Sequence, residues 1–153
     1  MKHKIVSILS LLTFSMICMA CAPQVTDIPA MPTPSAQGDP AEGQAGLMND
    51  LQSAGMDVEM GDTVEQPFFA VNGRIIKVND ADVQVFEYQS AETMEADAVQ
   101  VSADGGSIGT SMISWMATPH FFKSGSVLVL YVGDDITILE ALKNIIGEQF
   151  AGR

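Results

Sequence analysis

Ser107 and His120 are the two side chains of this chain that most suggest chemistry. Ser107 lies in residues 105–109 (GGSIG), which match the G-x-S-x-G pattern around a serine nucleophile. That pattern needs a strand before the serine and a helix after it, whereas we expect a helix before Ser107 and a strand after it. A small serine hydrolase that uses Ser107 and His120 is therefore an alternative and not the leading hypothesis.

Aromatic side chains surround His120, with Trp115 upstream and Phe121 and Phe122 directly after it. His120 is a candidate general base or ligand at an aromatic pocket, or else a half-buried loop histidine bonded to backbone. Adjacent residues of a strand point to opposite faces, so either a second layer covers one of the two phenylalanines or one is exposed. Trp115, His120, Phe121 and Phe122 are the candidate binding residues, for an envelope protein or a small apolar ligand.

Three acidic clusters offer hard oxygen ligands for a divalent cation such as Ca²⁺, which gives a second alternative function. They are Asp57, Glu59, Asp62 and Glu65; Asn79, Asp80 and Asp82; and Asp134 with Asp135. None has the spacing of an EF-hand loop, and turn formation or helix capping explains two of them. We therefore expect neither a metal ligand set nor a cofactor.

The N-terminal residues have the pattern of an export signal. Lys2, His3 and Lys4 precede an apolar stretch over residues 5–19, which is too short to span a membrane and is typical of a secretory signal. The stretch ends in residues 17–21 (ICMAC), and this resembles the lipobox of bacterial lipoproteins, with the small Ala20 before Cys21. Cys18 stands where that family usually has leucine. The resemblance covers only residues 1–21.

The resemblance implies that residues 1–20 are removed and that Cys21 carries a thioether-linked diacylglycerol, usually with an added N-acyl chain. Two or three acyl chains anchor a protein stably. The expected location is the cell membrane or the outer membrane, on the extracytoplasmic face. Cleavage by an ordinary signal peptidase and a retained leader remain the alternatives.

Composition divides the rest of the chain into a tether and one domain. Residues 21–40 hold five of the seven prolines and predict an extended tether, whereas residues 41–153 predict a single domain. Of the 7 basic residues, Lys2 and Lys4 leave with the leader, so 5 remain against 19 acidic residues, a formal charge of −14. This charge excludes nucleic acid as a partner.

Hydrophobic periodicity predicts an α+β domain with a mainly antiparallel sheet and helices packed on one face. Helices are expected over residues 42–54, 91–101 and from Asp134 or Asp135 to 146. Strands are expected over residues 56–60, 64–71, 74–78, 83–88, 111–116, 120–123 and 127–132, with a hairpin turn at Asn72-Gly73. Residues 83–146 follow the order β-α-β-β-α, which resembles half of a ferredoxin-like split unit with an extra helix.

These observations favour a binding protein over an enzyme. Without Cys18 and Cys21 the domain has no thiol, and without His3 its only imidazole is that of His120. A cysteine nucleophile, a disulfide framework and a thiolate zinc site are thereby excluded. The leading hypothesis is a lipid-anchored extracytoplasmic lipoprotein that acts as a non-catalytic binding or assembly module of the cell envelope.

Overall fold

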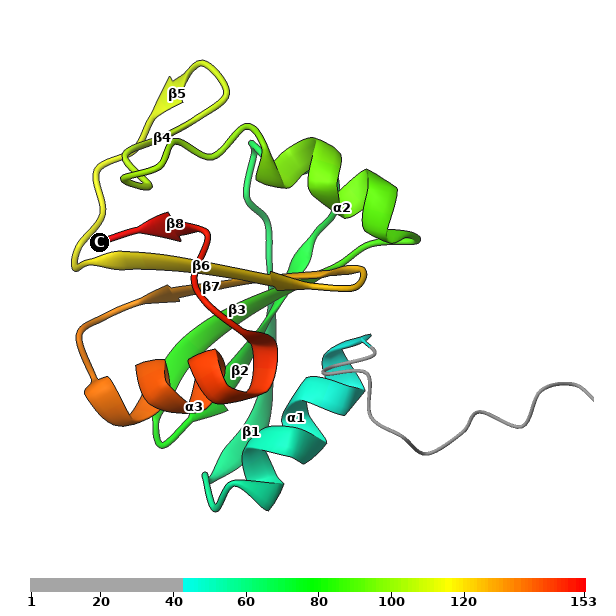
Figure 1. Ribbon diagram of the computed structural model, residues 1–153, viewed down its shortest axis with the longest axis vertical. Helices are drawn as coiled ribbons and strands as arrows, with labels where there is room; N and C mark the ends of the chain where they lie inside the picture. Colours follow the sequence, from blue (N-terminus) through cyan, green and yellow to red (C-terminus); the bar gives the residue numbers. More distant parts are fainter. Residues whose placement is uncertain (1–42) are drawn as a thin grey trace, which may run out of the picture. The chain divides into compact units, whose positions relative to one another are not determined.

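An antiparallel sheet of six strands is the central element of the domain (Figure 1). The structure is a computed structural model that describes residues 43–153. The strands follow the order β1-β2-β3-β7-β6-β8, and β4 pairs with β5 in a separate small hairpin. The strands are β1 (Val58–Val64), β2 (Gly73–Val78), β3 (Ala81–Glu87), β4 (Ser107–Ile108), β5 (Ser111–Met112), β6 (Pro119–Ser124), β7 (Val127–Val132) and β8 (Ala151–Gly152); the helices are α1 (Gly43–Ser53), α2 (Ala91–Ala98) and α3 (Ile136–Ile146).

The predicted signal peptide (residues 1–20), the lipidated Cys21 and the tether up to residue 40 lie outside the described residues. Within the described part of the chain, none of the helices has the length and hydrophobicity that a membrane crossing requires.

Apolar side chains fill both faces of the sheet. Figure 1 shows α1 and α3 on one side and α2 with the β4–β5 hairpin on the other. The face under α1 and α3 buries Leu47, Leu51, Val83, Val85, Phe122, Val129, Ile138 and Leu142. The opposite face buries Phe86, Met94, Ala98, Ile108, Phe121, Leu128 and Leu130.

The α+β class, with a mainly antiparallel sheet and helices packed on it, is confirmed. The expectation that all helices share one face is wrong, because α2 packs on the face opposite α1 and α3. The reason lies in β7, where every residue from Val127 to Tyr131 is buried. A strand that is apolar on both sides needs a cover on both sides.

The order of strands in the C-terminal part is that of a split β-α-β unit. β3 and β6 each pair antiparallel with β7, so β3 and β6 are parallel to each other with β7 between them. α2 forms the crossover between β3 and β6. The predicted β-α-β-β-α order is present, but α3 covers the face opposite α2, so the likeness to half of a ferredoxin-like unit stops at the strand order.

The link between β1 and β2 differs from the predicted hairpin. β1 is one strand whose register shifts between Met60 and Thr63, where the sequence predicts a turn between two strands. Residues 65–72 form a longer loop, and Gly73 is the first residue of β2. A Cβ atom on Gly73 would lie 2.6 Å from Cε1 of Phe86, so this position needs glycine because an aromatic ring passes over it.

Asn79 and Asp80 make the tight turn between β2 and β3, which is shorter than the stretch 79–82 that separates the two predicted strands. Val78 pairs with Ala81, which leaves a two-residue loop. Asn79 has φ 49° and Asp80 has φ 69°. Positive φ at both positions is the geometry that suits the twist of an antiparallel pair, and Asn and Asp tolerate it better than most residues.

Polar side chains cap the two helices next to the sheet's central strands. Ser90 accepts from Thr93 N at 3.2 Å, and Ser90 N donates to Thr93 Oγ1 at 3.3 Å, which forms a capping box at α2. Asp135 accepts from Thr137 N at 2.8 Å at the start of α3, and Gly147 ends that helix with φ 115°. Of the two residues at which the last helix is expected to start, Asp135 rather than Asp134 holds the capping position.

Candidate functional site

His120 lies on β6 and faces α3. It stands opposite Tyr131 of β7 in the sheet register, and the two rings stack at 6.2 Å between centroids with 22° between their planes. Only 6% of His120 is exposed. Its Nδ1 atom is 2.7 Å from Oε1 of Gln149, which follows α3. The ring is therefore held between a neighbouring strand and the segment that returns from α3 to the sheet.

The Gln149 contact fixes which nitrogen of His120 carries a proton. A carbonyl oxygen only accepts, so Nδ1 is the donor in this hydrogen bond. In the neutral ring, Nε2 is then an acceptor with a free lone pair. This atom is buried and has no hydrogen-bond partner among the described residues. A buried polar group without a partner costs about 1–3 kcal/mol and is an unusual feature in a folded domain.

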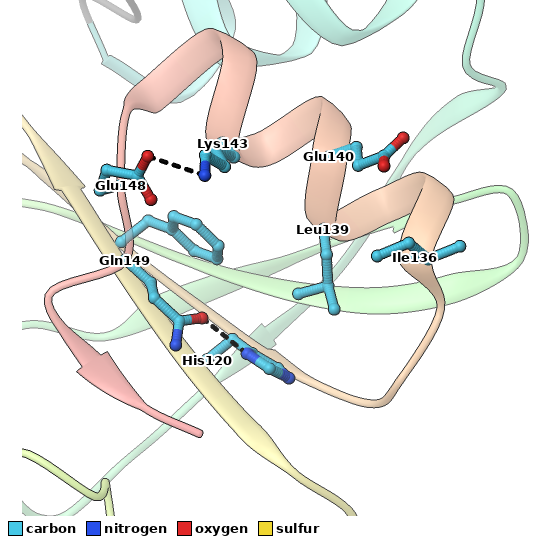
Figure 2. A pocket seen from close by; sticks show the side chains of 8 residues that line it. His120, Ile136, Leu139, Glu140, Lys143, Glu148 and Gln149 are labelled. Carbon is cyan, nitrogen blue, oxygen red and sulfur yellow. Dashed lines mark hydrogen bonds and ion pairs between the residues drawn. The ribbon is translucent and has the colours of Figure 1, made fainter.

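His120 lines a pocket of about 380 Å³ between β6 and α3. Figure 2 shows its ring below the side chains of α3, with Nδ1 turned to Gln149 and Nε2 pointing away from it. The volume lies at the lower end of the range for small-ligand sites. The lining residues are His120 and Phe122 of β6, Ile136, Leu139, Glu140 and Lys143 of α3, and Glu148 and Gln149 of the following segment.

Three charged side chains line this pocket. Lys143 and Glu148 form an ion pair at 2.7 Å, and both are largely exposed. Glu140 is also exposed and makes no ion pair within residues 43–153. The lining therefore carries two carboxylates and one ammonium group. An anionic ligand that enters this pocket would therefore meet net negative charge.

Ser107, the candidate nucleophile, is not near His120. It belongs to the β4–β5 hairpin, whose Ile108 packs in the core on the α2 face, whereas the His120 ring faces α3. Ser107 N donates to Ser102 Oγ at 2.9 Å, and Ser107 O accepts from Ser102 N at 2.9 Å. The sheet thus separates the two residues, and the serine hydrolase reading is not supported by their placement.

Asp104 organises the glycine-rich loop before Ser107. It accepts from Gly106 N at 3.0 Å and from Ser102 Oγ at 2.8 Å. The Gly106 amide, and after it the Ser102 hydroxyl, hold the pKa of Asp104 below its usual range. The loop is a turn that re-enters a strand, the role that the sequence favours over a nucleophile elbow.

The four residues predicted to bind a partner are divided between the two faces of the sheet. Phe122 joins His120 at the α3 face, whereas Phe121 packs on the α2 face. Phe121 is 0% and Phe122 is 2% exposed. An exposed aromatic patch that includes both phenylalanines is therefore ruled out, and the alternative of a covering layer on each face is confirmed.

Trp115 lies on the α2 face and is only partly buried. Its Nε1 donates to Gly105 O at 2.7 Å, and its ring contacts that of Phe121 with centroids 6.0 Å apart. The most exposed apolar residues of this region are Met112 and Met116, which are 92% and 102% exposed. Trp115 therefore serves to hold the 105–116 segment, and it does not share a surface with His120.

The acidic clusters do not converge on a common point. In the part of the chain that the structure describes, no three His, Cys, Asp or Glu side chains come together in a way that could hold a metal ion. Asp80 lies in the β2–β3 turn, Asp82 pairs with Lys77 at 2.7 Å, and Asp135 caps α3. These contacts give the divalent-cation alternative no support.

Asp97 is a buried carboxylate that the sequence does not single out. It is 7% exposed and accepts from Ala70 N at 2.7 Å, Tyr88 Oη at 2.9 Å and Gln100 Nε2 at 3.3 Å. These bonds tie α2 to the end of β3 and to the 65–72 loop. Three donors satisfy the carboxylate, so its role is structural.

The Tyr88–Asp97 bond predicts a loss of stability at alkaline pH. Burial, and after it the hydrogen bond to Asp97, raise the pKa of Tyr88 above its usual range. The unfolded chain loses this proton near pH ~10, so the stabilisation is complete below that pH and declines as pH rises above it. We expect urea denaturation between pH 8 and 11 to show a steeper decline for the wild type than for Tyr88→Phe. Parallel curves for the two proteins would contradict this prediction.

Several pocket residues escape sequence reasoning. Ile136, Leu139, Glu140 and Lys143 recur at the spacing of one helical face, next to the buried face of Ile138 and Leu142. That spacing is detectable, but nothing in the sequence marks this second face as a pocket wall. Gln149 carries no motif at all, since its role depends on where the chain returns after α3.

Comparisons with protein-family models, with curated proteins and with solved structures find no match to this chain. Function therefore has to follow from the residues and their geometry. The feature that stands apart from ordinary packing is the pocket with the unpartnered Nε2 of His120.

Proposed function

We propose that this chain is a lipid-anchored extracytoplasmic lipoprotein whose domain is a non-catalytic binding module of the cell envelope. Its binding site is the His120 pocket, and its ligand is a small molecule with an apolar body. Of the two partner classes expected from the sequence, an apolar ligand and an envelope protein, the pocket favours the ligand. Phe121 and Phe122, two of the four candidate binding residues, are buried and offer no exposed surface to a partner protein.

The observation that carries this proposal is the buried Nε2 of His120, which has no hydrogen-bond partner in the described part of the chain and belongs to a pocket-lining ring. Folding leaves this atom unsatisfied at a cost that the surrounding core has to offset. The lining combines the apolar side chains of Phe122, Ile136 and Leu139 with a few polar groups, and such a mixture is the usual composition of a small-ligand site. A ligand that bonds to Nε2 would recover the cost and gain contact with Phe122 and Leu139.

The surroundings of His120 favour binding over catalysis. A catalytic imidazole that takes up a proton is usually oriented by a carboxylate, which stabilises the imidazolium. His120 is oriented instead by the Gln149 amide, which offers no negative charge. Ser107, the candidate nucleophile, lies across the sheet. The pocket can hold and orient a ligand, but it lacks a base with a charged partner next to a nucleophile.

The proposed anchor rests on the lipobox resemblance of residues 17–21, which lie outside the described residues. We expect mass spectrometry of the protein from its own cell to show an N-terminal peptide that begins at Cys21 and carries the mass of the acyl chains, and Cys21→Ala to lack this added mass. Cys18→Ala is the matched control and should keep it. An unmodified Cys21 thiol in the wild type would contradict acylation at Cys21.

Amide NMR with two six-carbon probes, 1-hexanol and 2-hexanone, tests the proposed site. The full-length Cys21→Ala chain is suited to it, because it carries no acyl chains that would absorb the probes. We expect saturable shifts for at least one probe at residues 120–122, 136–143 and 148–149. Shifts that fail to saturate with both probes, or that map to the α2 face, would refute the proposed site.

A further inference from the structure

We infer that the His120 pocket takes an uncharged ligand that donates a hydrogen bond from one end of an apolar body, as an aliphatic alcohol does, and that it discriminates against the matching carboxylate. This inference rests on the proposed function, because it specifies the ligand class of the same pocket. Three features carry it: the tautomer of His120, the charges that line the pocket, and the apolar wall beside the ring.

The tautomer sets what the ligand must offer. Gln149 Oε1 accepts from Nδ1 at 2.7 Å, so the neutral ring presents a bare lone pair at Nε2. A doubly protonated ring would instead bury a positive charge and a second donor that has no acceptor among residues 43–153. The ligand group that meets Nε2 is therefore a donor. A ketone or an ether offers only an acceptor and leaves Nε2 unsatisfied.

The charges of the lining select against an anion. Lys143 is already paired with Glu148 at 2.7 Å, and Glu140 adds a further carboxylate. An incoming carboxylate would have to compete with Glu148 for Lys143 and would lose its hydration. The whole chain has 19 acidic residues against 7 basic ones, and this excess of negative charge also disfavours an anionic ligand.

A charged donor such as an alkylammonium is disfavoured for a different reason. Nε2 is buried, so an ammonium group that reaches it would lose most of its hydration in exchange for one hydrogen bond. A hydroxyl group costs far less to bury and satisfies the same lone pair. Its alkyl body then packs against Phe122, Leu139 and Ile136.

Access to Nε2 needs a small rearrangement, because the atom itself is shielded from solvent. Figure 2 shows the Leu139 side chain projecting from α3 toward the ring. Both residues line the same pocket, so Leu139 is the side chain that we infer has to move for a ligand to reach the lone pair. Side-chain rotamer changes of this kind commonly accompany binding without backbone movement.

The test compares dissociation constants for 1-hexanol, 2-hexanone and hexanoate on the full-length Cys21→Ala chain. We expect 1-hexanol to bind about three- to tenfold more tightly than 2-hexanone, the effect of one net hydrogen bond, and hexanoate to bind weakest. A ketone that binds as tightly as the alcohol would overturn the inference and leave the pocket standing as a binding site. Absence of saturable binding by all three would remove the proposed function as well.

Gln149→Leu tests the tautomer argument separately. Without the Gln149 carbonyl, the ring proton can move to Nε2, so we expect the preference for 1-hexanol over 2-hexanone to shrink or reverse. Gln100→Leu, on the α2 face, is the matched control and should keep the wild-type ratio. An unchanged ratio in Gln149→Leu would overturn the inference. If that variant does not fold, a nitrogen NMR signal for His120 showing Nε2 protonated in the Cys21→Ala chain overturns it equally.

Discussion

Phe121→Ala and Phe122→Ala are each expected to lower the free energy of unfolding by about 3–5 kcal/mol, as measured by urea denaturation. Both side chains are almost completely buried, at 0% and 2% exposure, and each belongs to a different core. Truncation leaves a cavity that the packed surroundings fill only in part. Since a domain of this size is stable by only about 5–15 kcal/mol, the double variant is expected to be largely unfolded.

Met116→Ala is the control for this pair. Met116 is fully exposed in the same region, so its truncation should change the free energy of unfolding by no more than about 0.5 kcal/mol. If Phe121→Ala were as mild as Met116→Ala, the phenylalanine would lie at a surface and the division into two cores would be wrong. The comparison therefore separates a core role from the surface role that the sequence also allows.

Ile136→Trp is expected to weaken the binding of 1-hexanol about tenfold or more. Ile136 lines the pocket yet is 64% exposed, so a larger side chain can fold into the space without disturbing the core. A tryptophan ring placed there occupies volume that the ligand needs in a pocket of about 380 Å³. Calorimetric titration of the Cys21→Ala chain with and without Ile136→Trp measures the change.

Val99→Trp is the matched control for the pocket variant. Val99 is 70% exposed and follows α2, on the other side of the sheet. The same enlargement at this position should leave 1-hexanol binding unchanged. Equal loss in both variants would point to a general effect on the fold, and undiminished binding in Ile136→Trp would place the ligand elsewhere.

Local signals in the sequence predict much of the fold. The unbroken apolar run of residues 127–132 predicts a central strand, and β7 is that strand. Ser90 and Asp135 act through contacts with residues two or three positions away, so their capping roles can be read without the tertiary structure. The α+β class follows from the same local patterns.

The errors arise where a residue has a tertiary role that resembles a local one. Asn72-Gly73 has the composition of a hairpin turn, yet Gly73 is kept small by the Phe86 ring, which comes from another strand. The adjacent Phe121 and Phe122 indicate that both faces of the sheet are covered. The sequence pattern does not say which helix covers which face. The placement of α2 opposite α3 follows from side chains that meet only in the folded chain.

The pocket is the part of the structure that sequence reasoning reaches least. His120 and Gln149 are 29 positions apart, and their hydrogen bond decides which ring nitrogen remains free. His120 is recognisable as a candidate because it is the only imidazole of the predicted mature chain. The hydrogen bond of His120 to Gln149 and its separation from Ser107 both depend on which face of β6 the ring occupies. That face is set by the register between β6 and β7.

Intermolecular nuclear Overhauser effects between 1-hexanol and the full-length Cys21→Ala chain test the central claim most directly. They report which side chains the bound probe touches. The proposed site predicts contacts from the alkyl protons to Phe122, Leu139 and Ile136, and from the hydroxyl end to the His120 ring. Contacts confined to Met112, Met116 or Trp115 would contradict it, because those side chains belong to the opposite face of the sheet.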